Sequence, residues 1–312
     1  MSPLPYRPRP GREDRSGPDS CEGPASFEGP ASFEGSASRW VRVRTADGSW
    51  TALEPGSGRA LHDLAGARTE ARLRFAQAAG LDRVPAGACV ELLDLGCGFG
   101  HNLAAAEELA HARGFELSVL ALERDPRVWA AAEHLPPDPA YGFEAARRRV
   151  RERLERGAAG WELRFGPAEL EERTLGQRRF DAVFLDGYAP STADSLWEAE
   201  FLARVARRLR PGGLVTTYTA SSRIRAAFMA AGLEVGVGPR VGRRVGGTVA
   251  RRTSGRAANT DELAVDGVDP ERAEALLEPS WSPLEDGQRR KLERRGRRIA
   301  DQLTCDGKSQ VG

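Results

Sequence analysis

The chain is poor in lysine and cysteine, and its charges nearly cancel. Lysine occurs only at Lys291 and Lys308, so the 46 basic residues are almost all arginine, and they face 45 acidic residues. A formal charge of +1 argues against a small, strongly basic nucleic-acid-binding module. The four cysteines are scattered and form no Cys-x-x-Cys pair, which argues against a disulfide framework and a structural zinc site. We therefore expect no bound metal.

The chain also has no long apolar run. No stretch reaches the roughly 18 apolar residues of a membrane span, and the N-terminus lacks the apolar segment of a secretory signal. We therefore expect a cytoplasmic protein with no membrane partner. With 312 residues and 40% hydrophobic residues, the chain can build a sizeable core in one large domain or two modest ones.

Three regions differ in composition. Residues 1–38 are rich in Pro, Gly and Ser and repeat Glu-Gly-Pro-Ala-Ser-Phe at 22–27 and 28–33, which predicts a disordered leader. Residues 39–250 carry regular secondary-structure patterns, beginning with a predicted hairpin at 40–53 and a helix at 66–79. Residues 251–312 predict an irregular basic extension, in which a basic amphipathic segment near 284–303 is interpreted as a solvated helix or tail.

Strand and helix patterns alternate through the middle region. Five short apolar runs predict strands at 89–95, 117–122, 161–165, 180–185 and 214–219, with helical patterns between them. Strands that alternate with helices form a mostly parallel sheet covered by helices on both faces. We therefore predict an α/β fold of the Rossmann-like type.

A glycine loop follows the first of these strands, and an acidic residue ends the second. The spacing Gly-x-Gly-x-Gly lets the backbone approach a ligand closely, but a dinucleotide fingerprint would require glycine where His101 stands. A strand-end carboxylate can accept protons from both ribose hydroxyls of a nucleoside. S-adenosylmethionine suits this pattern, although the glycines could instead close a tight turn and the acid could be merely solvated. The predicted cofactor-binding residues are Asp94, Gly96, Gly98, Gly100, Asn102 and Glu123.

A longer segment carries a family resemblance. Phe180-Asp-Ala-Val-Phe-Leu-Asp-Gly-Tyr-Ala-Pro190 resembles the Phe-Leu-Asp-Gly-Phe-Ala-Pro signature of the methyltransferase domain of the MnmC family, which methylates an aminomethyl group on the wobble uridine of certain tRNAs. The resemblance continues in register through Trp197, Arg210-Pro-Gly-Gly213, Ala231-Gly-Leu233 and Gly242-Arg-Arg244. Upstream, residues 45–49, 61–62, 66–67 and 70–71 are similar to the N-terminal region of stand-alone members. The resemblance covers about residues 39–250.

This resemblance implies a class I S-adenosylmethionine-dependent methyltransferase and a role for several residues. Asp186 is the predicted proton acceptor for the substrate amine, although it could instead cap the turn that follows it. Tyr188 and Trp197 are predicted to flank an extruded base, and core packing is at least as good an interpretation for Trp197. Arg243 and Arg244 are predicted to contact the phosphate backbone of the tRNA anticodon loop, with a solvated loop as the alternative.

The chain also departs from the family. Gly166-Pro167-Ala168 stands where Gly-Asp-Ala is usual, so a carboxylate expected near the adenine amine is missing. The fused flavin-dependent oxidase of the bifunctional members has no second glycine fingerprint here, so we expect methyl transfer alone, with a separate enzyme supplying the aminomethyl group. Two alternatives remain open: a methyl- or aminopropyltransferase acting on a small free amine, and a noncatalytic tRNA-binding protein.

Overall fold

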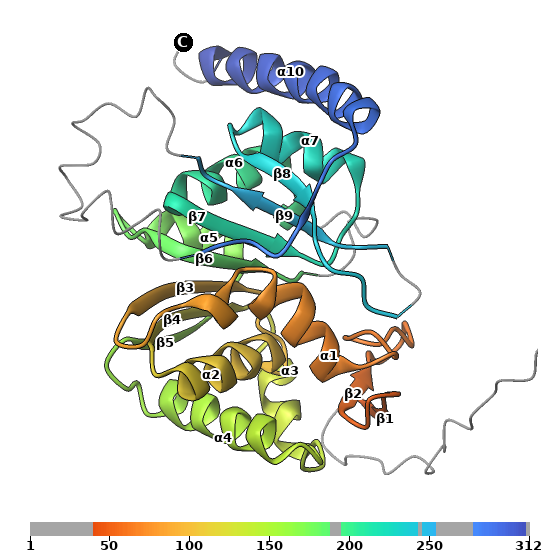
Figure 1. Cartoon of the computed structure of the whole chain (residues 1–312), viewed down its shortest axis with the longest axis vertical. Helices are drawn as coiled ribbons and strands as arrows, with labels where there is room; N and C mark the ends of the chain where they lie inside the picture. The colour runs from red at the N-terminus through yellow and green to blue at the C-terminus, as the bar shows by residue number, and fades with distance from the viewer. Residues whose placement is uncertain (1–39, 188–194, 243–244, 254–276, 310–312) are drawn as a thin grey trace, which may run out of the picture.

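A computed structural model describes residues 40–187, 195–242, 245–253 and 277–309, shown in Figure 1. The predicted leader at 1–38 lies outside these residues, as do Tyr188, Arg243 and Arg244. An eight-stranded sheet forms the centre of the molecule, and its strands follow the order β10-β8-β9-β7-β6-β3-β4-β5. The strands are β3 (Cys89–Leu95), β4 (Glu116–Glu123), β5 (Trp161–Phe165), β6 (Phe180–Leu185), β7 (Leu209–Thr217), β8 (Glu234–Val237), β9 (Thr248–Arg251) and β10 (Ser282–Pro283).

Five of these strands are parallel neighbours, and the other three run antiparallel at one side. Strands β3 and β4, β4 and β5, β3 and β6, and β6 and β7 pair in parallel, whereas β9 joins β7 antiparallel and carries β8 and then β10. The chain leaves β3 toward β4 on one side and later returns to β6 on the other. This reversal beside β3 is the topological switch point, where open α/β sheets bind ligands at the carboxyl ends of their strands.

Helices cover both faces of the sheet, as the strand patterns predicted. They are α2 (His101–Arg113), α3 (Pro126–Ala131), α4 (Tyr141–Glu155), α5 (Ala168–Glu171), α6 (Ala199–Arg208) and α7 (Ser222–Ala230). Successive strand residues point to opposite faces, so Leu92 of β3 packs with α2 and α4 while Leu93 packs with α6 and α7. Figure 1 shows the first helix pair on one side of the sheet and the second on the other. The α/β Rossmann-like prediction is confirmed.

An N-terminal extension packs beside this sheet. A separate hairpin of β1 (Val41–Arg44) and β2 (Trp50–Leu53) precedes α1 (Ala67–Glu70), which continues without a break into a π-helical segment, Ala71–Gln77. Phe75 of that segment is fully buried and meets Phe184 of β6 edge to face, with ring centroids 5.6 Å apart. The extension is thereby fixed against the sheet, close to the carboxyl end of β6.

The C-terminal region differs from the irregular extension expected after residue 250. Strand β9 runs on to Arg251, β10 adds to the sheet edge, and α10 (Asp286–Ser309) is a long helix packed on α7. Leu292 is 5% exposed, and Gly296 lies so close to α7 that an added Cβ would stand 3.1 Å from the Ala226 carbonyl oxygen. The helix therefore docks through one apolar and small-residue stripe and is not a free tail.

Within the described ranges, no helix combines the length and the apolar character needed to cross a membrane.

Candidate active site

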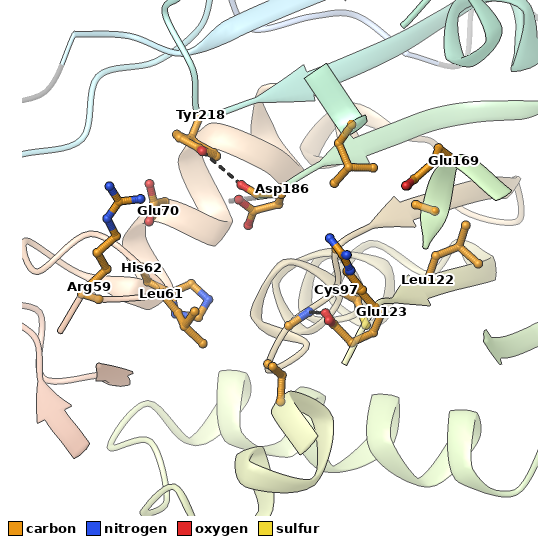
Figure 2. Close-up of a pocket in the computed structure, with 18 of the residues that line it drawn as sticks. Arg59, Leu61, His62, Glu70, Cys97, Leu122, Glu123, Glu169, Asp186 and Tyr218 are labelled. Atoms are coloured by element: carbon orange, nitrogen blue, oxygen red, sulfur yellow. Dashed lines mark hydrogen bonds between the residues drawn. The ribbon is translucent and has the colours of Figure 1, made fainter. Parts of the chain in front are cut away.

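A cavity of about 490 Å³ opens at the carboxyl edge of the sheet (Figure 2). Its walls come from four places: the glycine loop after β3, the ends of β4 and β6, the start of α5, and the N-terminal extension. In Figure 2, Glu123 and Glu169 lie on one side of Asp186, and Glu70 and Arg59 lie on the other. We call these the glycine-loop half and the extension half of the cavity. Asp186 stands between them.

The glycine loop places its backbone where side chains would not fit. Gly96 has φ +85°, and an added Cβ would lie 2.5 Å from the Asp186 carbonyl oxygen, so only glycine lets the loop pass the end of β6. Gly96 and Gly98 line the cavity. Gly100 instead caps the start of α2 with φ +75° and packs against Trp129, where an added Cβ would stand 3.2 Å from the ring. Gly100 therefore shapes the loop from behind.

Asp94 is buried beneath this loop. Its exposure is 0%, and neither carboxylate oxygen has a hydrogen-bond partner among the residues that the structure describes. Burial holds its pKa well above the usual value, and the nearby Asp186 and Glu123 carboxylates add to that effect. An unsatisfied buried acid is costly, so Asp94 is ready to accept a hydrogen bond from a ligand or a water bound at the loop.

Glu123 ends β4 and faces the cavity, as the sequence predicted. One carboxylate oxygen accepts a hydrogen bond from the Gly98 N–H at 2.8 Å, and the other accepts one from the Asp125 N–H at 3.0 Å. Burial raises the pKa of Glu123, and the backbone donors oppose that rise. Because each carboxylate oxygen has two lone pairs, both can also accept a proton from a ribose hydroxyl. The two backbone bonds hold the carboxylate in the orientation this requires.

Asp186 follows β6 and lines the middle of the cavity. Burial raises its pKa to about 8, helped by the charge of Glu70 and opposed by a hydrogen bond from Asn102. That bond joins Asn102 Nδ2 to Asp186 Oδ2 at 2.7 Å, and it corrects our assignment of Asn102 to the cofactor. Asn102 is 2% exposed on the first turn of α2, so it reaches Asp186 and acts as a positioning residue.

Aromatic and charged groups complete the extension half. Tyr218, just after β7, lines the cavity and donates its hydroxyl to the Gly187 carbonyl at 3.0 Å. Trp197 is only 1% exposed and packs edge to face on Tyr218, with ring centroids 6.0 Å apart. Base stacking does not fit such burial, because the Trp197 ring has no face open to the cavity. Trp197 therefore supports Tyr218 from the core.

Two histidines lie behind this half. His62 lines the cavity, and burial lowers its pKa to about 4, so its ring is neutral at physiological pH. Its Nδ1 lies 2.8 Å from the Thr51 hydroxyl, and its ring centroid lies 4.4 Å from that of His101. His101 Nε2 is 3.0 Å from the Trp50 carbonyl oxygen. The pair ties the hairpin to the glycine loop, which agrees with the structural role expected for both.

Sequence reasoning missed three groups of the cavity. Glu70 and Arg59 come from the N-terminal extension, and no local pattern indicates that this extension reaches the sheet edge. Tyr218 could have been found, because it directly follows the strand that ends beside β6. Glu169 stands two residues beyond Pro167, so this wall of the cavity does carry a carboxylate despite the departure from the family pattern.

These features match a family of known function in sequence. The family described as S-adenosyl-L-methionine-dependent methyltransferase matches residues 143–253. The orphaned Asp94, the close-packed glycine loop and the oriented Glu123 also fit the nucleoside and amino-acid parts of that cofactor. The fold and site therefore define a class I S-adenosylmethionine-dependent methyltransferase domain.

Individual relatives narrow the resemblance. The chain is 34% identical over 91 residues to the tRNA 5-methylaminomethyl-2-thiouridine biosynthesis bifunctional protein MnmC of Pseudomonas fluorescens (strain Pf0-1), a match covering 29% of this chain and 14% of that protein. It is 36% identical over 89 residues to MnmC of Caulobacter vibrioides, covering 28% and 15%. The matches thus span about a seventh of the length of these curated relatives.

Solved structures share the fold over most of the chain. MNMC2 from Aquifex aeolicus superposes with a TM-score of 0.62 at 23% identity, covering 86% of this chain and 85% of that one. A spermidine synthase in complex with the transition-state analogue AdoDATO superposes with a TM-score of 0.51 at 13% identity, covering 84% and 86%. Together with the sequence matches, these likenesses identify the chain as carrying an MnmC-like methyltransferase domain.

Proposed function

We propose that this protein transfers a methyl group from S-adenosylmethionine to the primary amine of 5-aminomethyluridine, or its 2-thio form, at the wobble position of tRNA. The observation that carries the proposal is Asp186, a carboxylate with a raised pKa at the middle of the cavity, between the glycine loop and the extension. The names of the matched relatives, which concern 5-methylaminomethyl-2-thiouridine in tRNA, support the choice of substrate.

Asp186 addresses the main chemical difficulty, which is to present an uncharged amine. An alkylammonium has a pKa of about 10.4, so passing its proton to an ordinary carboxylate of pKa about 3.9 is uphill by about 9 kcal/mol. With the pKa of Asp186 at about 8 the same transfer is uphill by only about 3 kcal/mol. Asn102 fixes the orientation of this carboxylate, so the proton acceptor is already in place when the amine arrives.

The glycine-loop half of the cavity suits the cofactor, which supplies an electrophilic methyl group when bound. Glu123 would accept the ribose hydroxyls, and the backbone of Gly96 and Gly98 would lie against the ligand. Asp94 would accept a hydrogen bond directly or through water. Glu169, which accepts a hydrogen bond from the Ser195 hydroxyl at 2.5 Å, is the carboxylate available to an exocyclic amine on this side.

Recognition of the tRNA belongs to residues outside the described ranges. We keep the proposed stacking role of Tyr188 and the phosphate contacts of Arg243 and Arg244 with the anticodon loop. A separate enzyme would supply the aminomethyl group before methylation, and the reaction would take place in the cytoplasm. The proposal concerns methyl transfer only.

The decisive experiment uses labelled S-adenosylmethionine and tRNA carrying 5-aminomethyl-2-thiouridine, followed by digestion and mass spectrometry of the nucleosides. We expect a methylaminomethyl product. The Asp186→Asn variant should lose about 100-fold or more of the rate, the usual effect of removing a general base, while its affinity for S-adenosylmethionine changes little. If the wild type binds the cofactor but gives no product, the tRNA proposal is wrong.

A second function is favoured by the acidic walls of the cavity. Glu70, Glu123, Glu169 and Asp186 line it, against Arg59 and Arg124. This charge would also suit a small free polyamine as the acceptor in a methyl- or aminopropyltransferase. Competition separates the two functions: bulk tRNA should inhibit turnover if the anticodon loop is the substrate, and a diamine should be methylated only in the alternative case. A protein that binds tRNA without any turnover would be a noncatalytic binder.

A further inference from the structure

Glu70 is a buried carboxylate that faces the cavity from outside the parallel sheet. It is the last residue of α1, it is 6% exposed, and it lines the cavity on the side opposite to Glu123. The π-helical segment starts at the next residue, and such segments often occur at functional sites. Neither its position in the sequence nor the fold of the methyltransferase core explains why an acid is buried here.

The surroundings of Glu70 hold its carboxylate in one orientation. One oxygen accepts a hydrogen bond from Arg74 Nη1 at 2.8 Å, and the other accepts one from the Asp63 N–H at 2.6 Å. Arg74 is itself 2% exposed and also donates to the Val241 carbonyl at 3.3 Å. Both oxygens are thus fixed from behind, and their remaining lone pairs stay available for a donor in the cavity.

The charges around Glu70 leave this half of the cavity acidic. Arg74 lies 4.0 Å from the Asp63 carboxylate as well as contacting Glu70, so one buried cation is shared between two acids. Asp186 is a third acid, and its pKa is raised partly by the charge of Glu70. His62 is neutral, and Arg59 is exposed at the outer side. A cation placed between Glu70 and Asp186 would relieve this repulsion.

We propose that Glu70 and Asp186 form an ammonium-binding subsite, in which Glu70 binds and positions the protonated substrate amine and Asp186 removes its proton. This inference rests on the proposed function for the identity of the amine, but the subsite itself would accept any primary alkylammonium of suitable size. An alcohol of the same shape lacks the charge that Glu70 recognises. Glu70 therefore acts as a selectivity filter for amines.

The step balances in protons and electrons. The ammonium proton moves to Asp186, and the freed nitrogen lone pair forms the new bond to the methyl carbon. The electrons of the carbon–sulfur bond leave with sulfur, which loses its positive charge. The product nitrogen carries the positive charge again, and Glu70, which has stayed ionised throughout, faces that charge at the end of the reaction.

Binding tests the subsite without depending on tRNA. The protein saturated with S-adenosyl-L-homocysteine is titrated with 5-aminomethyluridine, with 5-hydroxymethyluridine and with 1,4-diaminobutane, in the wild type and in Glu70→Gln. We expect Glu70→Gln to weaken binding of an amine by about tenfold or more and to leave the hydroxymethyl compound unaffected. Glu107→Gln is the matched control, because Glu107 is also buried and is paired with Arg149 and Arg153, away from the cavity.

A pH profile distinguishes this role from a merely structural one. The charge of Glu70 raises the pKa of Asp186, so Glu70→Gln should lower that pKa and move the acidic limb of the rate profile, measured on whichever amine is turned over, to lower pH. It should also raise KM for the amine much more than it lowers kcat. Glu107→Gln should leave the profile in place.

The outcomes separate the two proposals. If 1,4-diaminobutane depends on Glu70 and the nucleoside does not bind, the subsite stands and the proposed tRNA substrate is wrong. If Glu70→Gln binds both amines as well as the wild type does, or if the acidic limb does not move, the subsite is overturned whatever the substrate.

Discussion

At the scale of single residues, the cavity uses acids whose orientation the backbone fixes. Glu123 shows this most clearly, because each of its carboxylate oxygens accepts a hydrogen bond from a loop N–H, one from Gly98 and one from Asp125. The same side chain thus shapes the glycine loop and presents its remaining lone pairs to a ligand. A change at Glu123 should therefore affect cofactor binding before it affects the chemical step.

We predict that Glu123→Gln weakens S-adenosylmethionine binding by about tenfold or more, since a hydrogen bond to a charged group contributes roughly 1.5–3 kcal/mol. The amide nitrogen of glutamine can no longer accept a backbone N–H, so one arm of the orientation is lost as well. Calorimetric titration measures the change. Glu116→Gln, at the exposed start of the same strand, should bind like the wild type. Equal affinities for all three proteins would remove Glu123 from the cofactor site.

At the scale of elements, the C-terminal helix is part of the folded core. Leu292 of α10 belongs to the same buried cluster as Phe228 of α7 and Leu284, which follows β10. Its neighbour Lys291 is exposed. The basic residues that dominate the sequence of this helix therefore lie around a narrow apolar stripe, and the stripe is what attaches it to α7.

Leu292→Ala should destabilise the protein by about 2–4 kcal/mol, the usual cost of removing a buried leucine side chain and leaving a cavity. Lys291→Ala should change stability by no more than about 0.5 kcal/mol, because it removes an exposed side chain. Chemical denaturation with matched slopes measures both. A solvated, undocked helix would make the two variants indistinguishable.

At the scale of the whole molecule, the acids in the cavity reduce stability so that the site can function. Asp186 has a pKa of about 8, against about 3.9 in an unfolded chain, so the folded protein holds this proton more tightly between those values. Stability from this group is fully present at low pH and is lost as the pH rises from about 4 to about 8. Ionised Asp186 therefore opposes folding at neutral and alkaline pH.

Asp186→Asn should consequently raise the Tm, and the gain over the wild type should be larger at pH 8 than at pH 5. Asparagine stays neutral at both pH values and can still accept the hydrogen bond from Asn102. Asp301→Asn, an exposed site on α10, should show no such growth with pH. Thermal melts at the two pH values measure the effect, and a gain that shrinks toward pH 8 would contradict the raised pKa.

The sequence by itself determined the frame of this protein and the acids at its strand ends. The five parallel strands, the glycine loop, Glu123 and Asp186 were all predicted, because alternating patterns and strand ends are local features, and parallel strands bring their carboxyl ends to one edge. The roles at that edge could be assigned only where a residue directly ends a strand. The MnmC resemblance added the class of reaction.

Tertiary structure alone decided which side chains meet. It turned Asn102 toward Asp186, enclosed Trp197 in the core behind Tyr218, and docked α10 on α7. It also brought Glu70, from a helix that precedes the sheet, to the cavity that Asp186 lines. These pairings depend on packing between segments far apart in the chain, and no local pattern of residues encodes burial or partners at that distance.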